Sequence, residues 1–125
     1  MRTACEVMVK FVLPAFRSLV ARRLAANYGL SQVDIAKLLG ITQPTISFYL
    51  SSKRGRWMEL LENNPKISEL ADAFAAALVQ GGKSEEELNA MICQLCMTFR
   101  ELPEYKNIGY VFARKRAALS VEYVS

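Results

Sequence analysis

Hydrophobic residues recur three and four positions apart along most of the chain, and no stretch shows the clean alternation, bounded by turn residues, that indicates a β-strand. Spacing of this kind places apolar side chains on one face of an α-helix. The pattern therefore predicts an all-α fold, with an N-terminal helical bundle followed by a second helical region.

The first predicted helix covers residues 5–27 and ends at Gly29. Because proline lacks an N–H donor and its ring clashes with the preceding turn, Pro14 is expected to kink this segment near Leu13 or to divide it into two helices. The residues of this helix that are available for the core are Leu19, Val20, Leu24 and Tyr28.

Two short helices are predicted next. Ser31 is a typical N-cap for a helix over 32–39, and Gly40 ends that helix. Thr42 is the corresponding cap of a helix over 43–51, whose first turn tolerates a proline because the missing N–H has no helical partner there. The pattern thus indicates two short helices separated by a tight glycine turn.

Helical spacing continues in the rest of the chain and predicts helices over 57–62, 65–79 and 84–101. Residues 108–124 are rich in Val, Tyr and Phe, but they also contain an Ala-, Arg- and Lys-rich stretch that favours a helix. We interpret this last segment as a helix with a strand-like end.

Charge is segregated along the chain, although the net charge is only +4. Residues 1–58 carry nine cations against two carboxylates, residues 59–104 carry three cations against nine carboxylates, and residues 105–125 carry four cations against one carboxylate. Such polarity is typical of a nucleic-acid-binding region joined to a region with another role. We therefore predict a DNA-binding domain over 1–63 and a helical dimerisation or sensing region over 64–125.

Composition excludes several classes of protein. A chain of 125 residues, 52% of them hydrophobic, is enough for an ordinary folded domain but not for a large multi-domain enzyme. No apolar run approaches the roughly 18 residues of a membrane-spanning helix, and no export signal is evident, so a cytoplasmic protein with no membrane partner is expected. Histidine is absent, which removes the usual imidazole-based catalytic and zinc sites, and we do not expect an enzyme.

The short helices at 32–51 have the packing pattern of a DNA-binding helix-turn-helix. Ala36 allows the helices to cross closely, and Gly40 supplies the left-handed turn between them. The residues that fill the space between the helices are Ile35, Leu39, Ile41, Ile46 and Tyr49. The segment 31–50 resembles the helix-turn-helix of the Cro-and-phage-repressor (XRE) superfamily, and the resemblance covers roughly residues 16–62. It implies DNA binding.

Helical geometry leaves Gln43, Pro44, Ser47 and Phe48 on the outer face of the second short helix, where they are expected to enter the major groove. Gln43 can form two hydrogen bonds to adenine, Ser47 can bond a base edge or a phosphate, and Phe48 or Pro44 can contact a thymine methyl group. The expected phosphate contacts lie at the helix N-termini and in the basic stretch after the second helix: Ser31, Gln32, Thr42, Thr45, Lys53, Arg54 and Arg56.

The N-terminal stretch 1–14 and the later Cys-x-x-Cys are also similar to a group of uncharacterised archaeal transcriptional regulators that bear this DNA-binding domain. This resemblance spans most of residues 1–101. It implies a regulator, but it names neither the signal nor the operator.

Cys93 and Cys96 lie three positions apart on one face of a predicted helix. With Cys5 as a possible third ligand they can hold an iron–sulfur cluster, zinc or another soft metal, or they can act as redox-sensing thiols. The alternative is that they are two small buried hydrophobic residues. A thioredoxin-like enzyme is not favoured, because that motif belongs in a βαβ setting.

One recognition helix buries little surface, so we expect a homodimer that holds two such helices on half-sites about 34 Å apart. The candidates for its interface are Leu88, Met91, Leu95 and Phe99. The sequence thus predicts a sequence-specific transcriptional regulator that binds double-stranded DNA. The alternative is an iron–sulfur or thiol-based redox protein in which the helix-turn-helix is structural or binds protein.

Overall fold

The computed structural model describes residues 6, 8–53 and 55–103. Within these residues the chain forms one π-helix and six α-helices and no strand, which confirms the all-α fold. In chain order the helices are η1 (Met8–Val12), α2 (Leu13–Tyr28), α3 (Gln32–Leu39), α4 (Gln43–Ser51), α5 (Arg56–Asn63), α6 (Pro65–Gln80) and α7 (Glu85–Arg100). The segment predicted over 108–124 lies outside the described residues.

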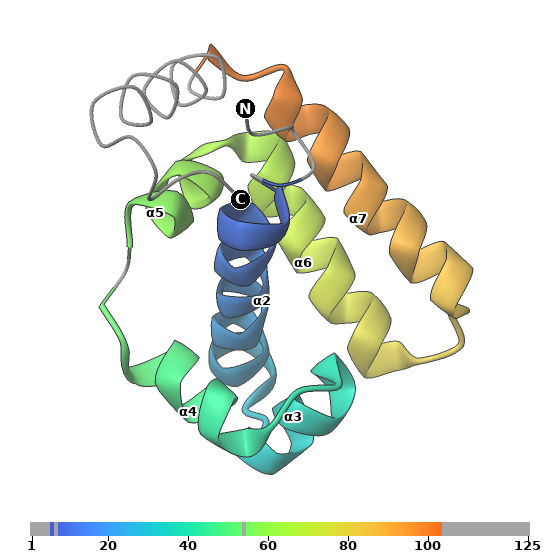
Figure 1. The fold of residues 1–125 in the computed structure, drawn as a ribbon. Coiled ribbons are helices and arrows are strands. Elements are labelled where there is room, and N and C mark those ends of the chain that lie inside the picture. Colours follow the sequence, from blue (N-terminus) through green and yellow to red (C-terminus); the bar gives the residue numbers. More distant parts are fainter. Residues whose placement is uncertain (1–5, 7, 54, 104–125) are drawn as a thin grey trace.

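Helix α2 is the centre of the molecule and packs against α3, α4, α5 and α6 (Figure 1). The pair α3–α4 lies at the C-terminal end of α2, and α5 lies near its N-terminal end. Helix α6 runs beside α2, and α7 packs chiefly against α6, so that α7 is the outermost helix. No helix in the described part of the chain has the length and apolar character needed to cross a bilayer.

The effect of Pro14 is the one predicted. Residues Met8–Val12 form a π-helix, and regular α-helix begins at Leu13, with Pro14 in its first turn. There the missing N–H of proline leaves no helical hydrogen bond unmade. The long N-terminal segment is therefore divided at Leu13.

Leu19, Val20 and Leu24 are fully buried, as expected, but the core position assigned to Tyr28 is wrong, because its side chain is 42% exposed. Tyr28 is the last residue of α2, and Gly29 follows it in the left-handed conformation. The backbone N–H of Leu30 then donates to the carbonyl of Leu24, which turns the chain back on itself. Leu30 packs against the core at this end of the helix.

A single hydrophobic cluster runs from Met8 to Phe99 and includes residues of both predicted regions. Aromatic contacts join the helices: Phe16 of α2 meets Phe74 of α6 edge to face, and Trp57 of α5 lies 6.0 Å from Phe99 of α7 between ring centroids. The two predicted regions, 1–63 for DNA binding and 64–125 for dimerisation or sensing, share one hydrophobic core. Their separate functions stay a prediction.

Arg23 adds a polar connection between the same regions. Its guanidinium donates to the Asp72 carboxylate and to the Ser68 hydroxyl, both on α6, and lies 3.6 Å from a carboxylate oxygen of Glu62 on α5. The side chain of Arg23 is only 18% exposed, so these partners supply hydrogen bonds that water does not. Helices α2, α5 and α6 are thereby held together at one point.

Leu95 and Phe99 are fully buried in this core. Both were expected at a dimer interface, but their side chains are already covered by the chain's own helices. A hydrophobic stripe on a helix shows which face is covered and not which element covers it. Leu95 and Phe99 therefore belong to the core of the single chain rather than to an interface between protomers.

Candidate nucleic-acid interface

The start of each helix in the pair α3–α4 is fixed by a side chain of the local sequence. The Ser31 hydroxyl accepts a hydrogen bond from the backbone N–H of Asp34, and the Thr42 hydroxyl accepts one from the backbone N–H of Thr45. Each bond satisfies a backbone donor that has no partner inside its helix. The two predicted N-caps are confirmed.

The turn between the helices depends on Gly40. Its φ of 68° lies in the left-handed region that glycine adopts without a steric penalty. This conformation lets the backbone N–H of Ile41 donate to the carbonyl of Ala36, 3.1 Å away, and so closes the end of α3. Only three residues then separate the end of α3 from the start of α4.

The inner faces of the two helices are sealed. Ile35 of α3 and Ile46 of α4 are fully buried, and Ala36 is nearly so. The other residues predicted to fill this space, namely Leu39, Ile41 and Tyr49, are half-buried and pack against the core. Burial on one side of α4 fixes which side of the helix remains open.

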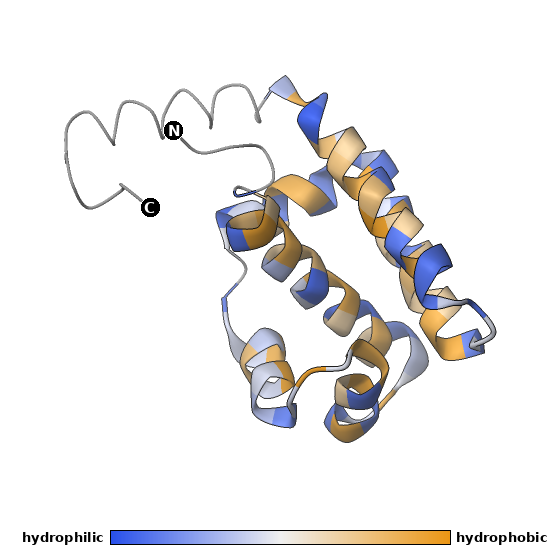
Figure 2. Cartoon of the chain, turned by 45° about the vertical axis from the view of Figure 1, so that its right-hand side comes forward, coloured by the Kyte–Doolittle hydropathy of each residue, from blue (hydrophilic) through white to orange (hydrophobic). Residues whose placement is uncertain are grey.

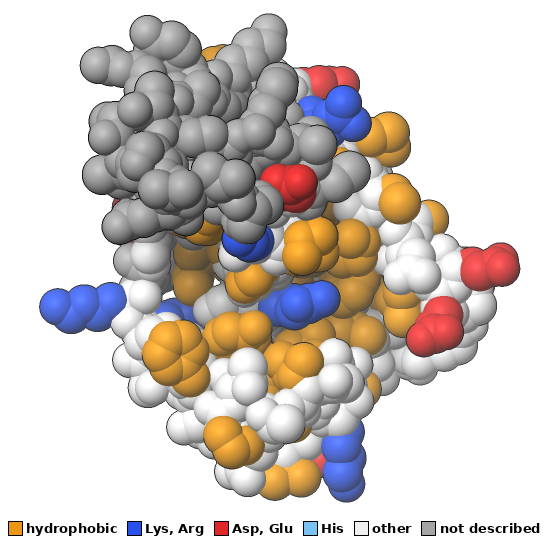
Figure 3. Space-filling model, in the orientation of Figure 1, with side chains coloured by type: hydrophobic (Ala, Val, Ile, Leu, Met, Phe, Trp, Pro, Cys, Tyr) orange, Lys and Arg blue, Asp and Glu red, His pale blue; other side chains and the backbone are white. Residues whose placement is uncertain are grey.

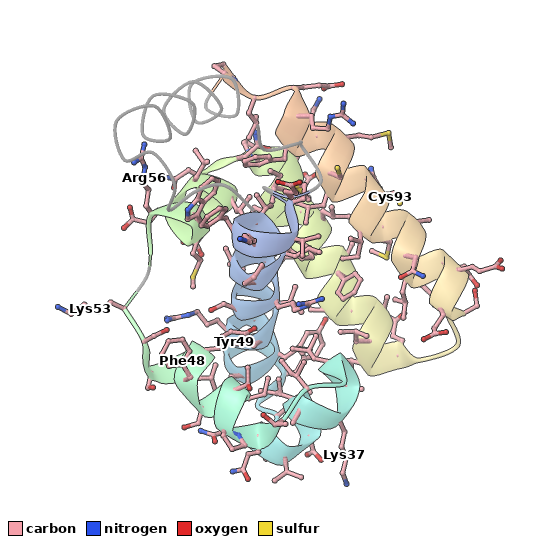
Figure 4. The ribbon with its side chains drawn as sticks, viewed as in Figure 1. Lys37, Phe48, Tyr49, Lys53, Arg56 and Cys93 are labelled. Carbon is pink, nitrogen blue, oxygen red and sulfur yellow. The ribbon has the colours of Figure 1, made fainter. Side chains whose placement is uncertain are left out.

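The open side of α4 carries the four residues predicted to contact bases. Gln43, Pro44 and Ser47 are exposed, and Phe48 is 66% exposed, an unusual position for a large aromatic ring. Figure 4 shows Phe48 pointing away from the body of the molecule. Helix α4 is drawn largely in pale shades in Figure 2, because many of its residues have intermediate hydropathy. None of residues 43–51 is charged.

One polar contact orients the first of these residues. The Gln43 side-chain amide donates to the side-chain oxygen of Gln32 across the pair, at 3.4 Å. An amide has two N–H donors and one acceptor oxygen, so Gln43 keeps a donor and its acceptor for another partner. Gln32, predicted to contact phosphate, therefore also positions Gln43.

The end of α4 is held by a contact that the sequence pattern did not reveal. The guanidinium of Arg22, on α2, donates to the backbone carbonyl of Ser52, the residue that caps α4. The backbone N–H of Ser52 in turn donates to the carbonyl of Phe48 at 2.9 Å. A cation among the buried residues Leu19, Val20, Ala21 and Leu24 was the available signal, since a charge in such a setting requires a partner.

Two exposed lysines flank this surface. Lys53 follows α4 directly and projects from the molecule on the same side as Phe48, whereas Lys37 projects from α3 at the other end of the pair (Figure 4). Lys37 was not among the predicted phosphate contacts. Arg56 is exposed at the start of α5, farther from α4, and Arg54 lies outside the described residues.

Acidic side chains lie elsewhere. Asp34 is the single carboxylate in residues 30–53, whereas helices α5 to α7 carry most of the acidic residues in the described part of the chain. In Figure 3 acidic side chains stand out at the right-hand edge, toward the start of α7, and they are sparse over α3 and α4. The surface around α4 therefore repels a phosphate backbone less than the rest of the molecule does.

The cysteines lie away from this surface. Cys93 is exposed on α7, on the far side of the molecule from Phe48, and Cys96 is half-buried against the core (Figure 4). Cys5 lies outside the described residues. Among the residues that the structure does describe, no three Cys, Asp or Glu side chains are grouped closely enough to hold a metal ion.

Residues 20–55 match the helix-turn-helix family. The chain thus carries a helix-turn-helix domain of the Cro/XRE type near its N-terminus, and a domain of this type suggests DNA binding and transcriptional regulation. No curated protein and no solved structure matches the chain.

Proposed function

We propose that this protein is a sequence-specific transcriptional regulator that inserts α4 into the major groove of double-stranded DNA. The observation that carries the proposal is the outer face of α4, where Gln43, Ser47 and Phe48 are exposed while Ile46, on the same helix, is fully buried. An α-helix fits the width of the major groove, and uncharged polar side chains read base edges there. A neutral face on a basic domain suits this role.

The residues have separate tasks in this proposal. Gln43, held by Gln32, pairs with an adenine through its free donor and acceptor. Ser47 bonds a base edge or a phosphate, and Phe48 and Pro44 contact thymine methyl groups. Direct base readout then rests on a helix whose two ends are fixed by Thr42 and Arg22.

Phosphate contacts are assigned by position. Lys53 and Lys37 flank α4 at its two sides, and we add Lys37 to the predicted set. The backbone N–H groups at the N-termini of α3 and α4 also attract phosphate oxygens. The remaining residues proposed for phosphate contact are Ser31, Gln32, Thr42, Thr45, Arg54 and Arg56.

We further propose that the regulator binds as a homodimer, because a single recognition helix offers little contact area. Leu88 and Met91 remain as candidates for the interface, since both are half-buried on α7. Kinship with the archaeal regulators that the chain resembles, and a redox or metal response through Cys93 and Cys96, belong to the same proposal. Ser substitution of both cysteines, followed by DNA binding under oxidising and reducing conditions, tests that response.

The decisive experiment selects a binding site from random duplexes and then compares variants on it. Gln43→Ala is expected to cost about 1–3 kcal/mol and to relax the preference at one base position. Lys53→Gln is expected to weaken all duplexes alike and to lower the slope of log K against log salt by about one unit. Gln80→Ala, an exposed glutamine at the end of α6, is the matched control and should bind as the parent does. Equal effects of Gln43→Ala on every sequence would contradict the proposal.

A further inference from the structure

A cavity of about 480 Å³ lies between α2, α3, α6 and α7. Its walls are mainly hydrophobic: Phe16 and Val20 from α2, Leu38 from α3, Phe74 from α6 and Ile92 from α7. Figure 3 shows hydrophobic side chains gathered across the centre of this face, with basic side chains among them. Pockets for small molecules are commonly of this size and character.

The two halves of α7 pack differently beside this cavity. Toward the C-terminus of α7, Leu95 and Phe99 are fully buried, and Phe99 lies against Trp57. Toward the N-terminus Leu88 and Ile92 are only half-buried and line the cavity. When an apolar molecule displaces the water beside half-buried leucine and isoleucine side chains, more apolar surface is buried and the free energy falls.

Arg17 gives this apolar cavity a specific polar group. It lines the cavity from α2, and among the described residues it makes no hydrogen bond and no ion pair. Its guanidinium has five N–H donors arranged in a fork that matches a carboxylate. The other polar residues of the lining are Glu85 and Asn89, at the start of α7.

We propose that this cavity binds a small amphipathic monoanion, with its apolar body against the leucine and phenylalanine walls and its carboxylate on Arg17. The charge of Glu85 sets the class of ligand. A group with two negative charges, such as a phosphate monoester, meets the Glu85 carboxylate in the same cavity and is repelled by it. A single carboxylate on an aliphatic or aromatic body can accept hydrogen bonds from Arg17, and it is repelled by Glu85 less than a doubly charged group is.

The test uses titration calorimetry of the full chain with octanoate and with 1-octanol, which share an apolar body and differ in charge. The parent protein is expected to bind octanoate about tenfold more tightly than 1-octanol, as a charge-assisted hydrogen bond provides. Arg17→Gln should abolish this preference and leave the binding of 1-octanol unchanged. Glu85→Gln should strengthen octanoate binding about twofold, because it removes the opposing charge.

Two further variants control the experiment. Lys66→Gln removes an exposed cation at the start of α6, outside the cavity lining, and should leave the preference for octanoate intact. Ile92→Trp fills the cavity and should abolish the binding of both probes while the helical circular dichroism is retained. The proposal is overturned if the folded parent binds no octanoate, if it binds both probes equally, or if Arg17→Gln keeps the preference. Since no DNA is present, these outcomes are independent of the proposed regulatory function.

Discussion

The helix pairs α3–α4 and α6–α7 are both joined by short glycine-containing connections, yet they present opposite kinds of surface. In α3–α4 the inner side is sealed around Ile35 and Ile46, and the outer side is open and neutral. In α6–α7 the outer side is rich in carboxylates, and the inner side is only partly closed, leaving a cavity beside α2.

The difference follows from what fixes each pair. Caps and a glycine turn fix the ends of α3 and α4, and the buried side chains of Ile35 and Ile46 hold the pair against α2. Helix α7 has a capping box at Ser84, but its position depends on long-range contacts such as that between Phe99 and Trp57. A surface whose helix ends are capped suits the reading of a duplex, whereas a partly open, mainly apolar pocket suits a small ligand.

The largest expected effect comes from comparing the buried side of α4, at Ile46, with its exposed side, at Phe48. Ile46→Ala is expected to lower the free energy of unfolding by about 2–4 kcal/mol, because it leaves a cavity in the core. Phe48→Ala, two positions away and mostly exposed, should change it by less than about 0.5 kcal/mol. Urea denaturation measures both. Similar losses in the two variants would show that Phe48 packs against the protein.

Arg22 and Arg23 are neighbours on α2 that serve different pairs. Replacement of either by Gln is expected to cost about 1 kcal/mol of stability, because each loses hydrogen bonds made by a partly buried cation. Only Arg22→Gln should also weaken DNA binding, since Arg22 holds the end of α4, whereas Arg23 contacts α5 and α6. Fluorescence anisotropy at a temperature where both variants are folded separates the effects. An equal loss of DNA affinity would remove the distinction.

The caps provide a smaller effect of the same kind. Thr42→Ala and Ser84→Ala should each lower stability by about 1 kcal/mol, because each leaves a backbone donor at a helix start unsatisfied. DNA affinity should fall in Thr42→Ala alone. Ser84→Thr keeps a hydroxyl and should retain most of the stability in thermal unfolding. If Ser84→Ala weakens DNA binding as much as Thr42→Ala does, α7 influences the recognition surface.

The smallest expected effect is a dependence on pH. The backbone N–H of Ser84 donates to the Glu87 carboxylate, and this bond, helped by the charge of Lys83, holds the pKa of Glu87 below its ordinary value of 4.5. A lowered pKa in the folded state means that this stabilisation is present above pH 4.5 and is lost as the pH falls through the lowered value.

Glu87→Gln should therefore differ most from the parent near neutral pH, and the difference should shrink in acid. Unfolding measured by circular dichroism between neutral and acidic pH checks this. Glu86→Gln is the control, because it removes the same charge from the same turn without touching the capping box. Identical pH profiles of the two variants would contradict the role given to Glu87.

The parts of the fold that the sequence predicted best are those encoded locally. Ser31, Gly40, Thr42 and Ser84 each determine a helix end through bonds that span three to five residues, and the structure places those ends where they were expected. The exposure of the outer face of α4 also followed from helical spacing, once Ile46 was assigned to the core. Helix ends that depend on bonds between residues close in the sequence can be predicted from the sequence alone.

Contacts between residues far apart in the sequence could not be predicted in the same way. The apolar stripe on α7 showed that Leu95 and Phe99 needed a cover, but their partners come from other helices of the same chain rather than from a second protomer. The bond from Arg22 to Ser52 spans 30 positions, and the cavity beside Arg17 combines four helices. Such features depend on how helices are placed in space, which spacing along one helix does not determine.

Helix α3 is eight residues long, about 12 Å from end to end, and both of its ends are engaged. Gln32 in its first turn touches Gln43, while Leu38 and Leu39 in its last turn form part of the cavity wall. One short helix therefore carries both the contact to Gln43 and part of the cavity wall. If an occupant of the cavity shifts α3 as a rigid body, it also shifts Gln32, and thermodynamic reciprocity then requires bound DNA to change the affinity for the occupant by the same factor.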